Sequence, residues 1–367
     1  GVQHAIEKAK ALREENNQAS LVQILVDNEY VTKRQIARLR QILEAERSGQ
    51  KIPGYKIMGK LGAGAMAGIT RALRAVLGKP FPLWSAEMPR PAKAARPATT
   101  QSGAAAAYFP ACISRTMGAL PGEPNETSLM EAFVEVASRA GTPVFIPEDV
   151  EGVCCGVPFS SKGYTEANVF AANRAIERFW AWSDEGRLPV VVDTSPCTYG
   201  VKGSRPNLTP ENQARFDRLT ILDGVAFTHD TLLPKLTAMR KAGPVALHPV
   251  CSLAKMGLGA KLEGIARFCS DVVVVPPSAG CCAFAGDRGF LHPELTASAT
   301  RHEAAEVKAS GCTEHLSSSR TCEIGMTRAT GEVYRSYLFL LERVTRPGPG
   351  PAVEAARSGA SARGSAG

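Results

Sequence analysis

The sequence predicts an α/β fold that contains two repeated units with largely parallel strands, preceded by an N-terminal helical segment. Short apolar runs alternate with amphipathic helical patterns from about residue 106 to residue 345, as they do in proteins built from βα units. Cysteines also recur in each half of this region in the same order, one, then an adjacent pair, then one. Together these observations predict two Rossmann-like, cysteine-rich units.

The chain before residue 106 predicts helices, a glycine-rich loop and a linker. Residues 1–50 carry apolar side chains at helical spacing among charges, which predicts a helical leader. The segment "IPGYKIMGKLGAGAMAG" resembles the start of a bacterial Ser/Thr protein kinase, with Gly62 and Gly64 as the first two glycines of the phosphate loop and Ala67 at the third. The H-R-D and D-F-G segments of a kinase do not follow. We therefore expect no kinase activity.

The elements after residue 106 follow in alternating order. Ser128 and Glu131 form a capping-box pattern before the first helix, and Gly141 predicts its end. Strands are predicted at 106–112, 142–149, 188–193, 244–249, 271–277 and, weakly, 314–318, and helices at 128–141, 165–182, 258–269 and 292–311. The expected organisation is a leader (1–50), a truncated kinase-like loop (51–68), a linker (69–105), cysteine-rich unit 1 (106–204), a helical connector (205–242), cysteine-rich unit 2 (243–345) and a disordered tail (346–367).

Eight of the ten cysteines lie just past the carboxyl ends of predicted strands. In parallel α/β sheets these ends share one edge, and ligands bind there. The spacing is C-x41-CC-x41-C in the first half and C-x29-CC-x39-C in the second. We therefore expect four thiols to converge in each half: Cys112, Cys154, Cys155 and Cys197 in the first, and Cys251, Cys281, Cys282 and Cys322 in the second.

The adjacent cysteines predict a metal site rather than disulfides. Neighbouring Cα atoms lie about 3.8 Å apart, whereas a relaxed disulfide needs roughly 4.4–6.8 Å. Four thiolates suit zinc or an iron–sulfur cluster, and thiols spread over such long segments favour the cluster. Zinc, redox thiols without metal and merely buried cysteines remain as alternatives. Cys269 and Cys312 are interpreted as incidental, Cys269 as a small core residue.

The segments around these cysteines resemble a known family. They are "YFPACISRTMG", "CCGVPFSSKGY", "VVVDTSPCTYG", "ALHPVCSLAKMG", "GCCAFAGDRGFLHPELTASAT" and "RTCEIGMTRATG". They are similar to the cysteine-rich (CCG) domain pair of the heterodisulfide reductase type, in particular to the C-terminal region of bacterial FAD-linked D-lactate dehydrogenases. The resemblance implies one or two iron–sulfur clusters, of the [4Fe-4S] type, with the first four cysteines as ligands of one and the second four as ligands of the other.

The resemblance also implies partners. Electrons would come from a flavin and ferredoxin-type dehydrogenase partner and leave to a downstream acceptor. The sequence contains neither an FAD domain nor a C-x2-C-x2-C-x3-C-P dicluster run. We therefore expect an oxidoreductase portion that relays electrons and does not oxidise a substrate alone, with FAD only in a partner region. A docking protein whose cysteines bind nothing, or a kinase-associated fragment, are the other interpretations.

Four positions depart from the family pattern or adjoin the expected sites. Thr194 and Ser319 stand where the fullest pattern has a further cysteine in each half, which leaves four thiols per site. Ala283 replaces the glycine that Gly156 supplies after the first cysteine pair, and its methyl group would crowd a tight loop. His248 adjoins the second site and is interpreted either as an ordinary hydrogen-bonded side chain or as a group that tunes a cluster.

Composition excludes some classes of function. The net charge of +8 is spread among acids, so nucleic-acid binding is not expected. No apolar run approaches the length of a membrane span, and we expect a cytoplasmic protein, with peripheral association at the inner face of the membrane left open. The first methionine is Met58, so a longer natural chain is expected.

Overall fold

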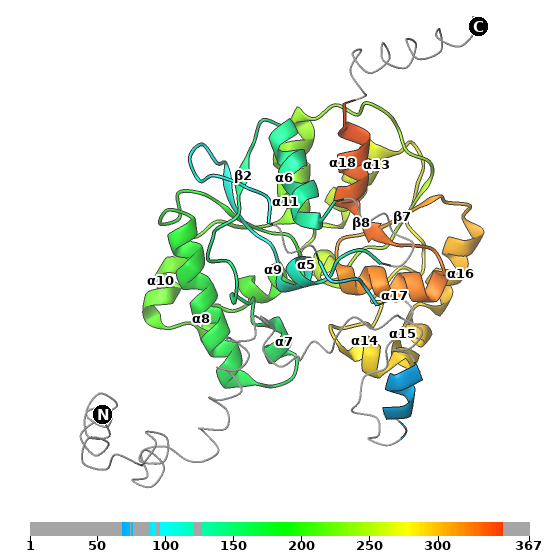
Figure 1. Ribbon diagram of the computed structural model, residues 1–367, viewed down its shortest axis with the longest axis horizontal. Coiled ribbons are helices and arrows are strands. Elements are labelled where there is room, and N and C mark those ends of the chain that lie inside the picture. Colours follow the sequence, from blue (N-terminus) through cyan, green and yellow to red (C-terminus); the bar gives the residue numbers. More distant parts are fainter. Residues whose placement is uncertain (1–67, 74, 76–87, 93–95, 121–126, 348–367) are drawn as a thin grey trace, which may run out of the picture. The chain divides into compact units, whose positions relative to one another are not determined.

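Two parallel β-sheets with the same strand order organise the protein (Figure 1). The computed structural model describes residues 68–73, 75, 88–92, 96–120 and 127–347, all of which belong to one structural unit. The first sheet has the order β2-β1-β3-β4 and the second the order β6-β5-β7-β8, and every pairing is parallel. The prediction of an α/β fold with two repeated, parallel units is confirmed.

The first sheet is surrounded by the helices that connect its strands. In chain order its elements are β1 (Ala106–Phe109), α5 (Cys112–Thr116), α6 (Leu129–Arg139), β2 (Val144–Phe145), α7 (Val157–Ser160), α8 (Thr165–Trp182), β3 (Val190–Val192), α9 (Ser195–Lys202), α10 (Pro210–Arg218), β4 (Ile221–Asp223) and α11 (Gly224–Phe227). The predicted capping box is present, since the Glu131 amide donates to Ser128 Oγ (3.1 Å) and the Ser128 amide donates to Glu131 Oε2 (2.6 Å).

The second sheet repeats this order after a π-helical turn (Thr228–Leu232) and a 3-10 turn (Leu233–Lys235). Its elements are β5 (Val245–Leu247), α12 (Cys251–Lys255), α13 (Gly259–Cys269), β6 (Val273–Val274), α14 (Arg288–Leu291), α15 (Pro293–Ala299), α16 (Arg301–Ala309), β7 (Glu314–Ser317), α17 (Arg320–Thr330), β8 (Arg335–Ser336) and α18 (Tyr337–Thr345). Thus β1 corresponds to β5, β2 to β6, β3 to β7 and β4 to β8.

The two units pack against each other reciprocally. The last helix of the second unit, α18, lies beside α6 of the first (Figure 1), and α11 of the first contacts α13 of the second. Arg139 at the end of α6 donates to the Glu342 carbonyl (2.7 Å) and to Glu342 Oε1 (2.6 Å). One hydrophobic core therefore serves both units.

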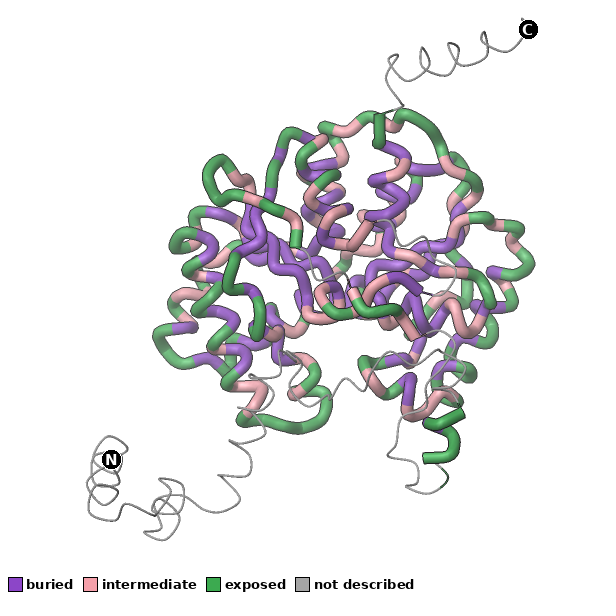
Figure 2. The backbone as a smooth tube through the Cα atoms, in the orientation of Figure 1, coloured by how far each residue is buried: buried purple, intermediate pink, exposed green. Residues whose placement is uncertain are grey.

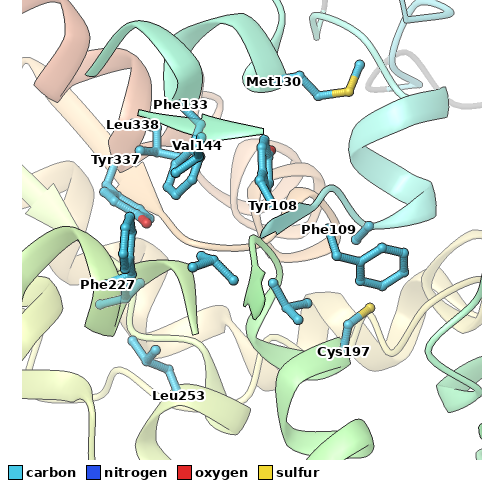
Figure 3. Packing of buried hydrophobic residues seen from close by; sticks show 14 of the residues in the cluster. Tyr108, Phe109, Met130, Phe133, Val144, Cys197, Phe227, Leu253, Tyr337 and Leu338 are labelled. Carbon is cyan, nitrogen blue, oxygen red and sulfur yellow. The ribbon is translucent and has the colours of Figure 1, made fainter. Parts of the chain in front are cut away.

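Figure 3 shows part of this shared core. Phe133 and Phe227 come from the first unit, and Leu253, Tyr337 and Leu338 come from the second. Burial follows the strands and the inward faces of the helices, whereas the outward faces are exposed (Figure 2). Burial of so much apolar surface is the main force that holds the units together.

The structure differs from the sequence-based expectation in four elements. The predicted helical connector contains α10 and α11, but also β4, which pairs with β3 and completes the first sheet. Strand β8 has no counterpart among the predicted strands. The single helix expected at 292–311 is two helices, α15 and α16, which are separated at Thr300, where φ is −95° and ψ is 0°. Part of the expected linker is bound to the first unit, because Pro91 bridges to Met117 and Arg96 donates to the carbonyls of Pro147 and Glu148.

Several predictions are not tested by the structure. The helical leader, the kinase-like loop up to Ala67 and the tail beyond residue 347 lie outside the described residues. The exact domain boundaries also remain predictions. None of the described helices combines the length and the apolar character needed to cross a membrane.

Candidate metal centres

The two groups of four cysteines occupy equivalent places in the two units. Strand order reverses between β1 and β3 in the first sheet and between β5 and β7 in the second. Such a switch point at the carboxyl ends of the strands is where open α/β sheets bind ligands. Cys112 and Cys251 follow β1 and β5, whereas Cys197 and Cys322 follow β3 and β7. We call the two groups site 1 and site 2.

The same helix positions carry the single cysteines of both sites. Cys112 is the first residue of α5 and Cys251 the first residue of α12. Cys197 is the third residue of α9 and Cys322 the third residue of α17. Helix N-termini present free backbone N–H groups and partial positive charge, which stabilise thiolates and anionic groups.

Site 1 brings its four predicted thiols together. Cys155 Sγ lies 2.9 Å from Cys197 Sγ, although 42 residues separate them along the chain. Cys154 is hydrogen-bonded to both Cys112 and Cys155. Cys155 and Cys197 are buried, whereas Cys112 and Cys154 are partly exposed. The site therefore has an inner pair and an outer pair of thiols.

Site 2 gathers the other four. Cys282 Sγ lies 3.2 Å from Cys322 Sγ, and both side chains are buried. Cys281 is exposed, contacts Cys251 and accepts a hydrogen bond from the Ala283 amide (3.4 Å). The inner pair is thus Cys282 and Cys322, and the outer pair is Cys251 and Cys281, as in site 1.

Proton sharing within each site holds one thiol as a thiolate. Hydrogen bonds from Cys112 and Cys155 lower the pKa of Cys154 to about 3, with help from the Gly156 amide and Arg115. The same hydrogen bonding to Cys154 raises the pKa of Cys112, and burial adds to this shift. The pKa of Cys155 is raised by its hydrogen bonds to Cys154 and Cys197 and by burial.

Site 2 repeats the arrangement with a different thiolate. A hydrogen bond from Cys322 lowers the pKa of Cys282 to about 5, against the opposing effect of burial. The pKa of Cys322 is raised by the same hydrogen bond and by burial. A cation that binds here would replace the shared protons and bring the remaining thiols to the thiolate form. Sulfur donors gathered from separate strand ends fit zinc or an iron–sulfur cluster.

Two loops place the adjacent cysteines. In site 1, Arg115 donates from its guanidinium to the carbonyls of Val150 (3.0 Å) and Val153 (2.8 Å), which fixes the approach to Cys154. In both sites the residue that follows the two adjacent cysteines has a positive φ angle, +83° at Gly156 and +52° at Ala283. The crowding expected from the Ala283 methyl group stays a prediction, and the structure shows a backbone at this residue in the left-handed region that favours glycine.

The two positions where the fullest family pattern has a further cysteine are helix N-caps. Thr194 precedes α9 and donates to Asp193 Oδ1 (3.0 Å), and Ser319 precedes α17 and hydrogen-bonds to Thr321 (3.2 Å). Both hydroxyl groups have local hydrogen-bond partners. Because Thr194 and Ser319 carry these hydroxyl groups in place of thiols, each site offers four thiols. Cys269 ends α13 in the core, as expected, and burial raises its pKa to about 12. Cys312 also lies outside both sites.

Two features of the site regions had no clear signal in the sequence. A pocket of about 520 Å³ opens beside Cys155 and is lined by Tyr199, Lys202 and Met256 among others. Its residues come from α7, α8, α9 and the segment after α9 of the first unit, and Met256 at the end of α12 comes from the second unit. In site 2, His248 pairs with Glu303, which lies 55 residues away along the chain. Only the position of His248 beside the expected site could have indicated this pair.

Parts of the sequence are similar to known proteins. Residues 106–202 match the model of the cysteine-rich (CCG) domain family, and this stretch contains all of site 1. The chain is also 24% identical over 172 residues to the C subunit of anaerobic glycerol-3-phosphate dehydrogenase of Escherichia coli, from strain K12 and from O157:H7. The match covers 45% of this chain and 42% of each relative, so it spans less than half the length of either. Residues 106–202 are therefore similar to a cysteine-rich domain, and the chain has a distant similarity to those subunits.

Proposed function

We propose that the protein binds an iron–sulfur cluster at each of its two sites and relays electrons within a dehydrogenase. The observation that carries this proposal is the repetition of one four-thiol arrangement at equivalent switch points of two sheets with the same topology. Two centres within one fold suit the passage of electrons better than they suit structural support, since the shared core already holds the units together.

The donor set favours iron–sulfur over zinc. Structural zinc sites commonly use close cysteine pairs on short loops, whereas these thiols come from separate strand ends. The ligands would be Cys112, Cys154, Cys155 and Cys197 in site 1, and Cys251, Cys281, Cys282 and Cys322 in site 2. A bound cluster supplies reversible one-electron chemistry, with a potential that depends on burial and on hydrogen bonds to sulfur.

The chain's own residues would control this chemistry. The N-termini of α5, α9, α12 and α17 offer amides that stabilise negative charge at the thiolates. The buried inner pairs exclude water, whereas the partly exposed outer pairs leave an edge open to electron donors and acceptors. Helix α9 of site 1 packs on α12 of site 2, and Lys255 of α12 lies 5.5 Å from the ring centroid of Tyr199 of α9. This contact provides a direct protein path between the sites.

We further propose that the electrons come from a flavin-containing partner that oxidises a small hydroxylated substrate. The motifs in the sequence favour a D-lactate-type, FAD-linked dehydrogenase, whereas the named relative is part of a glycerol-3-phosphate dehydrogenase. Ten free cysteines suit a reducing compartment, and we place the relay in the cytoplasm. Mixing the loaded chain with each type of dehydrogenase, with either D-lactate or glycerol 3-phosphate as substrate, would identify the donor by reduction of the chain's clusters.

The first experiment measures the clusters themselves. The full chain would be purified anaerobically, supplied with iron and sulfide, and analysed for bound iron, sulfide and electron paramagnetic resonance after reduction. We expect about four to eight irons per chain, depending on whether one or both sites fill. Cys155→Ser should remove the signal of site 1 and Cys282→Ser that of site 2.

The matched control is Cys312→Ser, which changes a thiol outside both sites and should leave iron content unchanged. A colourless chain that takes up only zinc, or no metal, would overturn the proposal. If the two site variants also fold as stably as the unaltered chain under those conditions, the protein is a docking module without clusters.

A further inference from the structure

His248 is placed rigidly at the edge of site 2. It directly follows β5 and precedes Cys251 by three positions. Its amide donates to the Leu316 carbonyl (2.9 Å), and its carbonyl accepts a hydrogen bond from Ser317 Oγ (3.2 Å). Both partners belong to β7, the strand that leads to Cys322. The imidazole is therefore fixed by the same strands that position the thiols.

The two ring nitrogens of His248 have different surroundings. Nδ1 lies 2.7 Å from Glu303 Oε1, and the two side chains are 0% and 2% exposed. Nε2 is also buried, and no nitrogen or oxygen atom among the residues that the structure describes is hydrogen-bonded to it. A carboxylate at Nδ1 favours the tautomer with the proton on Nδ1, which leaves the lone pair on Nε2. The partner of this lone pair is the thiol group of Cys282, a weak hydrogen-bonding group, and a metal held between the two side chains would replace the shared proton.

This histidine is directed at the inner thiols of site 2. A ring nitrogen of His248 and the Sγ atoms of Cys282 and Cys322 all lie within 4.8 Å of one another, and all three residues are buried. Since Nδ1 is occupied by Glu303, Nε2 is the nitrogen available to a metal. A carboxylate–histidine pair of this kind is the usual support of a metal-binding imidazole.

Among the described parts of the chain, no histidine joins the thiols of site 1 as His248 joins those of site 2. The residue three positions before Cys112 is Phe109, the last residue of β1, and its ring packs 5.1 Å from Phe179 and 5.9 Å from Trp182 between centroids. The two sites are thus alike in their thiols and different at this one inner position.

We propose that His248 binds, through Nε2, the metal centre that Cys282 and Cys322 hold in site 2. Site 2 is then a mixed nitrogen–sulfur site, whereas site 1 is bound by sulfur alone. The inference rests on the proposed function only in that site 2 holds a metal. Where the imidazole takes the place of one of the two outer thiolates of site 2, it adds less negative charge than that thiolate and raises the potential of an iron–sulfur centre. Electrons would therefore pass from site 1 to site 2.

The test detects nitrogen at the metal. The full chain would be produced with 14N-histidine or 15N-histidine, loaded with iron and sulfide, reduced, and examined by pulsed electron paramagnetic resonance. We expect a histidine nitrogen coupling that changes with the isotope. The coupling should be lost in the double variant His248→Phe with Glu303→Leu, which copies the phenylalanine of site 1 and leaves no unpaired buried acid. The control is His292→Gln, a partly exposed histidine outside the inner trio, which should keep the coupling.

A second measurement uses zinc alone, so that the outcome does not depend on cluster assembly. On addition of Zn²⁺ to the metal-free chain, the 15N resonance of His248 Nε2 should shift in the unaltered protein. Bound iron without a nitrogen coupling would overturn this inference and leave the proposed function intact. If no iron binds but zinc shifts His248, the electron relay fails and the mixed site stands. If neither metal affects His248, the inference is wrong whether or not the double variant folds.

Discussion

Gly156 and Ala283 occupy the same position, directly after the adjacent cysteines of their sites, and both have a left-handed backbone. Their φ angles are +83° and +52°. For glycine this region is accessible without steric cost, whereas a Cβ atom there costs about 1–2 kcal/mol. The second site therefore carries backbone strain that the first site does not, at the residue that orients its cysteine pair.

Replacing Ala283 with glycine should relieve this strain. We expect the free energy of unfolding of the metal-free protein to rise by about 1 kcal/mol, because the relief exceeds the added chain entropy of glycine in the unfolded state. The measurement is urea unfolding followed by circular dichroism. The reciprocal variant Gly156→Ala should be destabilised, since its Cβ would lie 2.7 Å from Asn168 Oδ1 in addition to the unfavourable φ. Equal effects of the two substitutions would contradict this account.

The contact between α6 and α18 should depend on Arg139. Its guanidinium satisfies both the backbone carbonyl and the carboxylate of Glu342 in a largely buried setting. Arg139→Met should lower the free energy of unfolding by about 1–3 kcal/mol, because the buried acceptors of Glu342 lose their donor from α6, although Arg346 and Thr345 still donate to them. Arg187→Met removes an exposed ion pair with Asp184 and should have an effect below about 0.5 kcal/mol. Similar losses in the two variants would show that the inter-unit contact is not important for stability.

Asp193 predicts a pH dependence of folding. It accepts hydrogen bonds from Tyr108 Oη (2.8 Å) and from the Ala111 amide (2.9 Å), yet burial raises its pKa above the ordinary value of 3.8. Because the folded state favours the protonated acid, Asp193 contributes to the stability of the folded protein below pH 3.8. This contribution is lost as pH rises through the raised pKa. The free energy of unfolding of the unaltered protein minus that of Asp193→Asn should therefore fall with pH and then become constant.

An exposed aspartate provides the control with the opposite sign. The hydrogen bonds from Arg205 lower the pKa of Asp217. Its contribution is present above the ordinary aspartate pKa and is lost as pH falls. The difference between the unaltered protein and Asp217→Asn should therefore rise with pH. A difference for Asp193→Asn that also rises would contradict the assignment of burial as the dominant effect.

Patterns repeated over many residues made the fold and the grouping of thiols predictable. The capping box at Ser128 and the order of cysteines in each half could be read directly, because both depend on local chemistry or on strand ends that must share an edge. Strand β4 could not be predicted from the sequence, since three residues beginning at Ile221 carry too little periodicity to be distinguished from the helices around them. The pairing of His248 with Glu303 depends on tertiary packing between β5 and α16, which no local pattern encodes.

Alkylation should distinguish the outer thiols of site 1 in the metal-free protein. Cys112 and Cys154 are both partly exposed and are hydrogen-bonded to each other, yet the pKa of Cys112 is raised and that of Cys154 is lowered to about 3. The thiolate is the reactive form. Under single-hit conditions iodoacetamide should therefore modify Cys154 first, at a rate that hardly changes between pH 5 and pH 8 because the thiolate is already formed. Modification of Cys112 should increase with pH.

Mass spectrometry of peptides after short reaction times would measure the two rates. Cys269 is the internal reference, since it is buried and its pKa is raised to about 12, so it should stay unmodified while the protein is folded. Loading with iron and sulfide should protect Cys154 if site 1 holds a cluster. A rate at Cys154 that rises tenfold per pH unit would show an ordinary thiol and would remove the electrostatic argument for a preformed thiolate site.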